Sequence, residues 1–290
     1  MNFFSRFNIY QKERFPLAIL TWTTVAVVLS SGSVATSHVK IVTILLACIS
    51  GIAYLFHIRV VDEVRDYSHD QTYHATRPIQ RGVISTKELQ TLDALSVTIF
   101  FAIALCFGVL STVIAIVCVL YTYIAGKEFF LGEKIRARFL LYNAVNLVQM
   151  ILLQFFVYSL FSKTWYMSHV LWLHLLFIFI NAVMLEIVRK IKIAPEESVG
   201  HDTYSWHIGF YTSLSIFFGL ALFDYAVFVK LVLSNISASL LTISGFFMLS
   251  LLISIFVHSH KKTKKTEIYL YLSALGLYIG LNLIIYLAFT

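Results

Sequence analysis

The sequence predicts an all-α, polytopic membrane protein with about nine transmembrane helices in one bundle around a central cavity. Hydrophobic residues make up 59% of its 290 residues and charged residues only 13%, and the mean hydropathy is +0.82. A soluble domain carries roughly 25% charged residues, so this chain cannot cover a water-facing surface. The polar residues also gather in a few short segments. We therefore expect residues 1–290 to form a single membrane-embedded domain.

Nine apolar runs carry this prediction. Most approach or exceed the ~20 residues that cross a hydrocarbon core of ~30 Å. The run Leu89–Ala125 is interpreted as two spans with a turn near Gly108. The first run lacks a small-residue cleavage site, so we expect a retained helix rather than a signal peptide. The nine runs are Phe15–Gly32, Val39–His57, Leu89–Gly108, Val109–Ala125, Phe139–Phe161, Trp165–Val188, Ile208–Val229, Leu231–Val257 and Ile268–Phe289.

The basic residues are distributed very unevenly between the two sides of this topology. With nine spans, the N-terminus and the loops 58–88, 126–138, 189–207 and 258–267 share one side, and they hold nineteen of the 22 Lys and Arg residues. Positively charged loops stay cytoplasmic. The N-terminus and these loops are therefore predicted to be cytoplasmic and the C-terminus to lie on the opposite face. Positive charge thus indicates topology, and no nucleic-acid partner is expected.

The loop after the second span contains three aspartates spaced by four, Asp62, Asp66 and Asp70. If the helix continues past the membrane, the three carboxylates form one stripe. Such close carboxylates repel one another, and a divalent cation removes that repulsion. Hard oxygen ligands suit Mg²⁺, which usually keeps waters and takes substrate phosphate oxygens. The alternative is a solvated acidic face compensated by Arg59 and Arg65.

Two arginines follow the acidic stripe in the segment Arg77-Pro78-Ile79-Gln80-Arg81-Gly82. Pro78 ends helical pairing, and Gly82 permits a tight return of the chain. Arg supplies bidentate donors to phosphate oxygens. Acids that hold a metal, followed by Arg77 and Arg81, are the parts that bind a diphosphate. The alternative is ordinary positive charge on a cytoplasmic loop.

At these residues the chain resembles a known family. The pattern Asp62-Glu63-x-x-Asp66-x-x-x-Asp70, with the Arg-Pro and Gly of the segment after it, resembles the first signature of the UbiA-type intramembrane prenyltransferase superfamily. That signature is written NDxxDxxxD, so Asp62 stands where Asn is usual and Glu63 where Asp is usual. The family also has nine helices, with catalytic loops after the second and sixth on the cytoplasmic side.

Tyr123 and Lys127, at the end of the fourth span, resemble the family's tyrosine and lysine four residues apart. In that role the lysine neutralises a leaving diphosphate and the tyrosine ring faces a carbocation. The alternatives are an interfacial aromatic belt for Tyr123 and a snorkelling side chain for Lys127. In the fifth span, Asn146 recurs with Asn143 and Gln149 at helical spacing. These side chains either line a cavity, with Asn146 as a candidate substrate-binding residue, or form interhelical hydrogen bonds.

The loop after the sixth span departs from the family, because the second DxxxD motif is absent. The Gly-x-x-Thr run at 200–203 resembles only the end of that motif. Arg189 and Lys190 are candidate diphosphate-binding residues, although either could instead pair with an acid at the end of the span. The candidate metal ligands in this loop are Glu186, Glu197 and Asp202.

The resemblance implies prenyl transfer from a polyprenyl diphosphate to an acceptor, with Mg²⁺ as cofactor and an allylic carbocation as intermediate. Aromatic rings, lipid alcohols, tetrapyrroles and sugar phosphates all serve as acceptors in the family, and nothing in these loops selects one. Membrane lipid is the surrounding partner, and no protein partner is implied. The alternative is a transporter or channel with an acidic cytoplasmic mouth. Transporters favour broken helices and ionisable groups at the midplane, whereas these acids lie at the interface.

Overall fold

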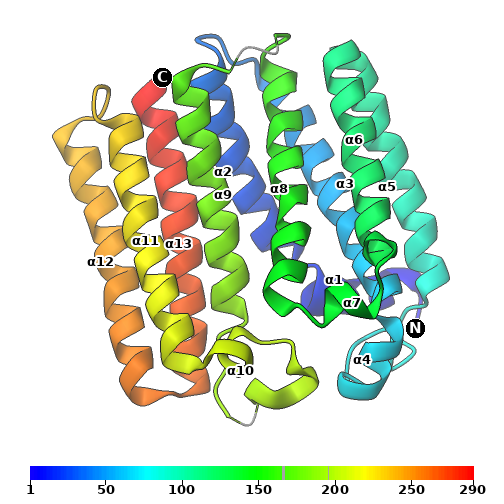
Figure 1. Cartoon of the computed structure of the whole chain (residues 1–290). Helices are drawn as coiled ribbons and strands as arrows, with labels where there is room; N and C mark the ends of the chain where they lie inside the picture. Colours follow the sequence, from blue (N-terminus) through cyan, green and yellow to red (C-terminus); the bar gives the residue numbers. More distant parts are fainter. Residues whose placement is uncertain (165–166, 195) are drawn as a thin grey trace. The chain divides into compact units, whose positions relative to one another are not determined.

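The computed structural model describes residues 1–164, 167–194 and 196–290, and all regular elements within these ranges are helices (Figure 1). Among the described residues, nine helices are long and apolar enough to cross a membrane, which confirms the predicted all-α membrane fold. They are α2 (Leu17–Ala35), α3 (Ile41–Arg65), α5 (Thr86–Phe107), α6 (Val109–Gly126), α8 (Phe139–Phe161), α9 (His169–Arg189), α11 (Phe210–Val232), α12 (Ala238–Lys261) and α13 (Lys264–Phe289).

The division of the long run at Gly108 is confirmed. Helix α5 ends at Phe107 and α6 begins at Val109, so one residue makes the whole turn. Gly108 has a φ of 110°, a conformation that glycine adopts without the steric cost that a Cβ imposes. The Ser111 hydroxyl donates to the Ala104 carbonyl at 2.8 Å and so occupies a carbonyl near the end of α5.

Two of the helix starts predicted from hydropathy differ from those in the structure. The sixth run was expected from Trp165, which lies outside the described residues, and α9 begins at His169. The eighth run was expected from Leu231, which was wrong, because α11 continues to Val232 and α12 begins at Ala238. The Ser237 hydroxyl accepts the Leu240 N–H at 3.4 Å. A serine cap therefore sets the start of α12, and hydropathy does not register a hydrogen bond.

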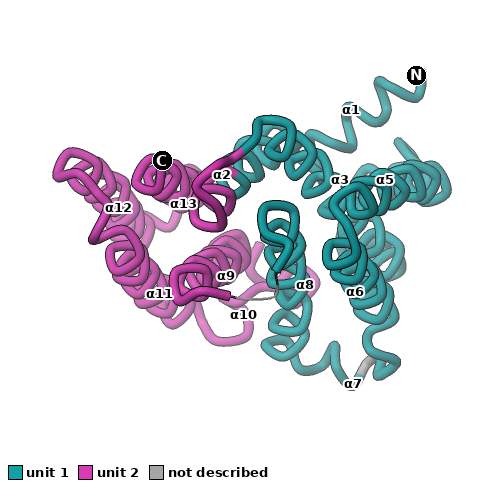
Figure 2. Tube along the Cα trace, turned by 90° about the horizontal axis from the view of Figure 1, so that it is seen from above, with its two compact units in different colours: residues 1–28, 40–165 teal, residues 29–39, 166–290 magenta. Residues whose placement is uncertain are grey.

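The chain divides into two compact units (Figure 2). Unit 1 comprises Met1–Val28 and Lys40–Trp165, and unit 2 comprises Leu29–Val39 and Tyr166–Thr290. Helix α2 contributes to both units. The expectations of a single domain and of a cytoplasmic N-terminus stay predictions.

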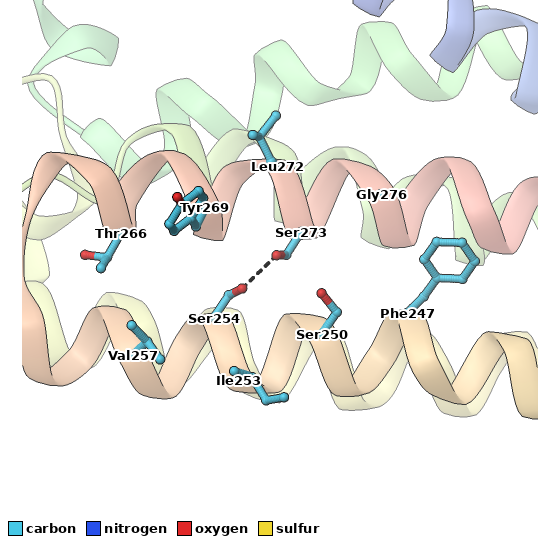
Figure 3. A pocket seen from close by; sticks show the side chains of 10 residues that line it. All are labelled: Phe247, Ser250, Ile253, Ser254, Val257, Thr266, Tyr269, Leu272, Ser273 and Gly276. Carbon is cyan, nitrogen blue, oxygen red and sulfur yellow. Dashed lines mark hydrogen bonds between the residues drawn. The ribbon is translucent and has the colours of Figure 1, made fainter.

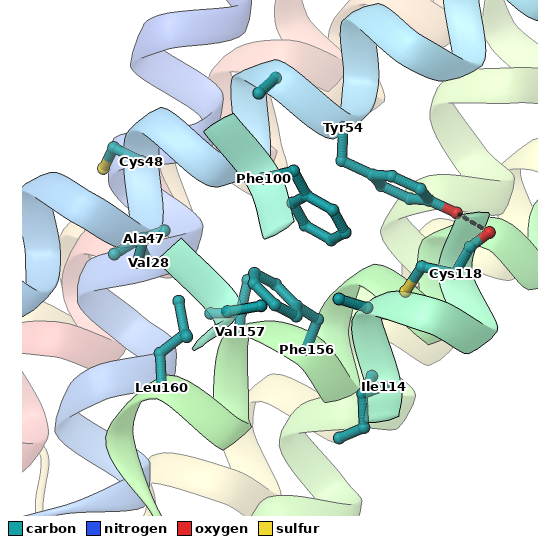
Figure 4. Packing of buried hydrophobic residues seen from close by; sticks show 13 residues of the cluster. Val28, Ala47, Cys48, Tyr54, Phe100, Ile114, Cys118, Phe156, Val157 and Leu160 are labelled. Atoms are coloured by element: carbon teal, nitrogen blue, oxygen red, sulfur yellow. Dashed lines mark hydrogen bonds between the residues drawn. The ribbon is translucent and has the colours of Figure 1, made fainter. Parts of the chain in front are cut away.

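In unit 1, buried aromatic side chains hold α3, α5, α6 and α8 together (Figure 4). The rings of Tyr54 and Phe100 stack at 5.1 Å between centroids, and Phe100 lies 4.3 Å from Phe156. The Tyr54 hydroxyl donates to the Cys118 carbonyl at 3.0 Å. This packing positions the end of α3, where the short helices α1 (Phe3–Arg14), α4 (Tyr67–Tyr73) and α7 (Glu133–Arg136) also lie (Figure 1).

Unit 2 packs α9 against α11 and α13, and α12 against α13, with the short η2 (Glu196–His201) and α10 (Tyr204–Ile208) between α9 and α11. Its interior contains polar side chains that bind one another. The Ser30 hydroxyl donates to Asn282 Oδ1 at 2.6 Å and lies 3.0 Å from His174 Nε2. Asn181 donates to Asp224 at 2.8 Å. Because lipid offers no hydrogen bonds, such groups need partners within the protein.

Candidate active site

The three aspartates keep their helical spacing across a break in the helix. Helix α3 ends at Arg65, and Asp66 has φ −90° and ψ 6° before α4 begins. The backbone hydrogen bonds continue through this junction, from the Asp66 N–H to the Asp62 carbonyl at 2.9 Å and from the Asp70 N–H to the Asp66 carbonyl at 2.8 Å. The expected stripe is therefore present, although the uninterrupted helix that was expected is replaced by two helices.

Asp62 and Asp66 share one guanidinium group. Arg65 lies 2.9 Å from Asp62 and donates to both carboxylate oxygens of Asp66 at 3.0 Å. Both aspartate side chains are 31% exposed, whereas that of Arg65 is 7% exposed. Arg136 approaches Asp66 to 3.9 Å. Burial disfavours the charged form of Asp66, but the hydrogen bonds and charge of Arg65 outweigh it and hold the pKa of Asp66 below its ordinary value.

Asp70 is buried instead of solvated, with 2% of its side chain exposed. It forms an ion pair with Arg77, and its Oδ2 atom lies 3.8 Å from Arg14. That Oδ2 atom is buried and accepts no hydrogen bond from the described part of the chain. A turn positions Arg77: its N–H donates to the His74 carbonyl at 2.9 Å, and Gly82 has a φ of 70°, as the predicted tight return requires.

Glu63 forms a second buried ion-pair cluster beside this stripe. Its Oε1 atom accepts from Arg14 Nε at 2.8 Å and from Arg59 Nε at 2.9 Å. Its Oε2 atom is buried and has no hydrogen-bond partner among the described residues. Burial and the neighbouring charge of Arg59 lower the pKa of Arg14. The solvated-face alternative is thus only partly right: Arg65 compensates two aspartates, but Arg59 binds Glu63.

Arg81 and Arg77 have different environments although four residues separate them. Arg81 pairs with Glu13 at 2.8 Å, and both side chains are 41% exposed. Lys127 places its ammonium 6.0 Å from the centroid of the Tyr123 ring. Tyr123 is 56% exposed, which fits an interfacial aromatic belt as well as a ring that faces substrate.

The three polar residues of α8 make different contacts. The Gln149 side chain accepts from Thr122 of α6 at 3.0 Å, so the interhelical alternative is confirmed for Gln149. Asn143 donates to the Phe139 carbonyl of its own helix at 2.7 Å. Asn146 is half-buried, and its carbonyl accepts from Gln149 at 3.3 Å. A substrate contact by Asn146 stays a prediction.

In unit 2, Glu186 lies in the last turn of α9 beside two cations. It accepts from Arg189 Nε at 2.6 Å and lies 2.8 Å from Lys190 Nζ, so the local ion pair that was the alternative to diphosphate binding is present. The carbonyl of Glu197 accepts from Thr203 at 2.7 Å. Glu197 and Asp202 are half-buried. Metal binding by the three acids and diphosphate binding by the two cations stay predictions.

No family model and no curated protein sequence matches the chain. Solved structures match it over nearly its whole length. A UbiA homologue from Aeropyrum pernix K1 is 13% identical, covers 91% of this chain and 96% of its own, and gives a TM-score of 0.65. A digeranylgeranylglyceryl phosphate synthase is 16% identical, with 98% and 97% covered and a TM-score of 0.61.

A UbiA homologue from Archaeoglobus fulgidus bound to GPP and Mg²⁺ is 13% identical, with 95% and 98% covered and a TM-score of 0.62. The chain has the UbiA fold. The resemblance drawn from residues 62–82 is therefore confirmed at the level of the whole architecture.

Within this UbiA fold, the acids of unit 1 have the chemistry that Mg²⁺ requires. Asp62, Asp66 and Asp70 offer only hard oxygen donors, the type that Mg²⁺ prefers. A carboxylate has about four lone-pair sites, and the observed arginines occupy only some of them. The buried Oδ2 of Asp70, which accepts no hydrogen bond from the described residues, is one such open position. The donor set thus fits Mg²⁺.

Sequence reasoning missed Arg14 and assigned Glu63 no partner. The Arg59–Glu63 pair has i,i+4 spacing, so it could have been predicted from helical spacing. Arg14 lies 49 residues from Glu63, and no local pattern marks it. Arg136 lies in the basic loop 126–138, but its approach to Asp66 depends on how the segment between α6 and α8 folds back.

Proposed function

We propose that this protein transfers a prenyl group from a polyprenyl diphosphate to an acceptor at the membrane. The observation that carries the proposal is the row of three carboxylates on successive turns of α3 and α4, interleaved with arginines, in a chain with the UbiA fold. Structural neighbours support it, because a UbiA homologue from Archaeoglobus fulgidus was solved both with DMAPP and Mg²⁺ and with GPP and Mg²⁺.

In this proposal Asp62, Asp66 and Asp70 hold Mg²⁺, which when bound neutralises charge on the departing diphosphate. Arg77 donates to the diphosphate oxygens, and Lys127 adds a further positive charge. The bond between C1 and the bridging oxygen breaks, and its electron pair leaves with the diphosphate. An aromatic ring such as Tyr123 stabilises the allylic cation. The acceptor then forms a bond to C1 and releases a proton.

The charge balance of the cluster supports binding of metal and diphosphate together. Five carboxylates meet five guanidinium groups in the described ion pairs: Asp62, Asp66, Asp70, Glu63 and Glu128 with Arg14, Arg59, Arg65, Arg77 and Arg136. A metal alone or a diphosphate alone would leave uncompensated charge in a partly dehydrated site, which is costly. We therefore infer that Mg²⁺ and the prenyl diphosphate each tighten the binding of the other.

The proposal is tested by incubating the purified protein with geranyl diphosphate or longer prenyl diphosphates, Mg²⁺ and a panel of aromatic, lipid-alcohol, tetrapyrrole and sugar-phosphate acceptors. Mass spectrometry should detect a prenylated product and equal release of diphosphate. Chelation of Mg²⁺ should stop both. Asp66→Asn should lower the rate by at least about 100-fold, the effect of removing one preorganised charge-stabilising group.

Glu13→Gln is the matched control, because it removes a carboxylate that pairs only with the exposed Arg81 in the described contacts. It should leave the rate within about threefold of that of the wild type, as expected for a surface ion pair. Glu186→Gln, Glu197→Gln and Asp202→Asn test the predicted metal ligands of unit 2 in the same assay. Full activity of Asp66→Asn in the presence of a chelator would contradict the proposal.

A further inference from the structure

A groove runs between α12 and α13 in unit 2 (Figure 3). Its volume is about 410 Å³, and its lining is mainly apolar. Phe247 lies at one end, near Gly276, and Val257 and Thr266 lie at the other. Between the two ends, the hydroxyl oxygens of Ser254 and Ser273 are 2.7 Å apart and bridge the helices.

The groove has the length of one lipid leaflet. Phe247 and Val257 are ten residues apart in their helix, as are Thr266 and Gly276, and ten residues of helix rise about 15 Å. Half of a hydrocarbon core of ~30 Å is the same length. The groove closes beyond Gly276: a Cβ at Gly280 would lie 2.6 Å from the Phe247 ring, whereas a Cβ at Gly276 would meet nothing within 4 Å.

Two lysines lie at the open end, one from each helix. Lys261, the last residue of α12, follows Val257 by four residues, and Lys265 precedes Tyr269 by four residues. Residues four apart share a helix face, so both lysines continue the groove-lining faces. The Lys265 ammonium lies 5.7 Å from the centroid of the groove-lining Tyr269 ring.

Within the described part of the chain, the charges of Lys261 and Lys265 are uncompensated, unlike that of Lys264. Lys264 lies 2.6 Å from Glu196 and 3.0 Å from Glu267. Among the side chains that the structure describes, no carboxylate lies within ion-pairing distance of Lys261 or Lys265, and both lysines are exposed. Basic residues at the cytoplasmic membrane surface attract anionic lipids.

We propose that this groove binds one anionic phospholipid, with an acyl chain between α12 and α13 and the phosphate headgroup on Lys261 and Lys265. The apolar lining and leaflet length fit the chain, and the two ammonium groups fit the phosphate. A zwitterionic phospholipid should bind more weakly, because the positive charge of its headgroup is repelled by the two lysine ammonium groups. This site uses none of the acids and arginines of unit 1. The lipid-binding proposal is therefore independent of the proposed prenyl transfer.

The lysines are tested by native mass spectrometry of the purified protein, titrated with dioleoyl phosphatidylglycerol or with dioleoyl phosphatidylcholine. The wild type should bind the phosphatidylglycerol more tightly. Lys261→Gln with Lys265→Gln should weaken that binding about 30-fold, which equals about 2 kcal/mol, and should abolish the preference. Lys12→Gln with Lys87→Gln makes the same change in net charge at two exposed lysines of unit 1 and should leave the affinity unchanged.

The groove itself is tested by Gly276→Leu, which places a side chain in the open space. This variant should weaken phosphatidylglycerol binding by at least tenfold. Gly219→Leu on α11 is the control, because a Cβ there also meets nothing within 4 Å, and it should bind like the wild type.

Three results would overturn the proposal: equal affinity of the wild type for the two lipids, equal losses for the two lysine pairs, or unchanged binding by Gly276→Leu. A dimer in the same spectra that Gly276→Leu dissociates would assign the groove to a second copy of the chain. None of these outcomes depends on catalytic activity.

Discussion

The acid cluster of unit 1 and the acid at the end of α9 in unit 2 differ in how their charges are paired. Glu186 binds Arg189 and Lys190, three and four residues along the same helix segment, and Arg189 is 54% exposed. Glu63 binds Arg14, 49 residues away, and has 1% of its side chain exposed. The first arrangement needs only a helix, whereas the second needs α1 to be held against α3. Buried charges of the second kind are costly to leave unpaired.

The largest expected effect separates the two arginines that follow the stripe. Arg77→Ala should lower prenyl-transfer activity by about 100-fold, because Arg77 is paired with the buried Asp70 and is proposed to donate to the diphosphate. Arg81→Ala should change the rate by less than about threefold, because Arg81 pairs with the exposed Glu13. The measurement is the rate of diphosphate release at saturating Mg²⁺. Equal losses would place both arginines at the site.

The next largest effect is on protein stability, when either the Glu63 ion pairs or the Glu186 ion pairs are removed. Glu63→Gln should lower the free energy of unfolding by about 3 kcal/mol, because the carboxylate that it removes is only 1% exposed and binds both Arg14 and Arg59. Glu186→Gln should cost less than about 1 kcal/mol, since the Glu186 side chain is 13% exposed and its partner Arg189 is 54% exposed. Denaturant unfolding of the two purified variants gives both numbers. If the two variants lost equal stability, the proposed difference between the Glu63 and Glu186 ion pairs would be wrong.

A smaller effect concerns acid stability. The pKa of Asp66 is held below its ordinary value of about 3.9, so the ionised form favours the folded state. Its contribution to stability is present above about pH 4 and is lost as the pH falls through the lower pKa of the folded state. Unfolding of the wild type between pH 6 and 2 should therefore show a pH dependence that Asp66→Asn reduces. An identical dependence of stability on pH in the wild type and in Asp66→Asn would contradict this prediction.

The smallest effect concerns Tyr10, which is buried beside Arg14, Arg59 and Glu63. Burial raises the pKa of Tyr10 to about 12, so its neutral form favours the folded state. That contribution is present below about pH 10, the ordinary tyrosine value, and is lost as the pH rises through about 12. Its hydroxyl has no hydrogen-bond partner among the described residues. Tyr10→Phe should thus change stability by less than about 1 kcal/mol at pH 7 and reduce unfolding above pH 10.

Features that depend only on residues close together in the chain could be predicted from the sequence. Nine apolar runs predicted nine spanning helices, because each run alone must cross the hydrocarbon core. The spacing of Asp62, Asp66 and Asp70 predicted one acidic row, because residues four apart share a helix face. Gly108 marked the turn between α5 and α6, since glycine accepts a positive φ.

The pairing of these local features depends on how the helices pack and could not be predicted from the sequence. Whether Arg14 binds Glu63 depends on how α1 packs against the end of α3, and no periodicity in either segment contains that information. Arg77 and Arg81 look equivalent in sequence, but one meets the buried Asp70 and the other the exposed Glu13. The groove between α12 and α13 likewise exists because two faces meet around Gly276. Ion pairs and grooves depend on distances between segments, whereas hydropathy and helical spacing report only each segment's own environment.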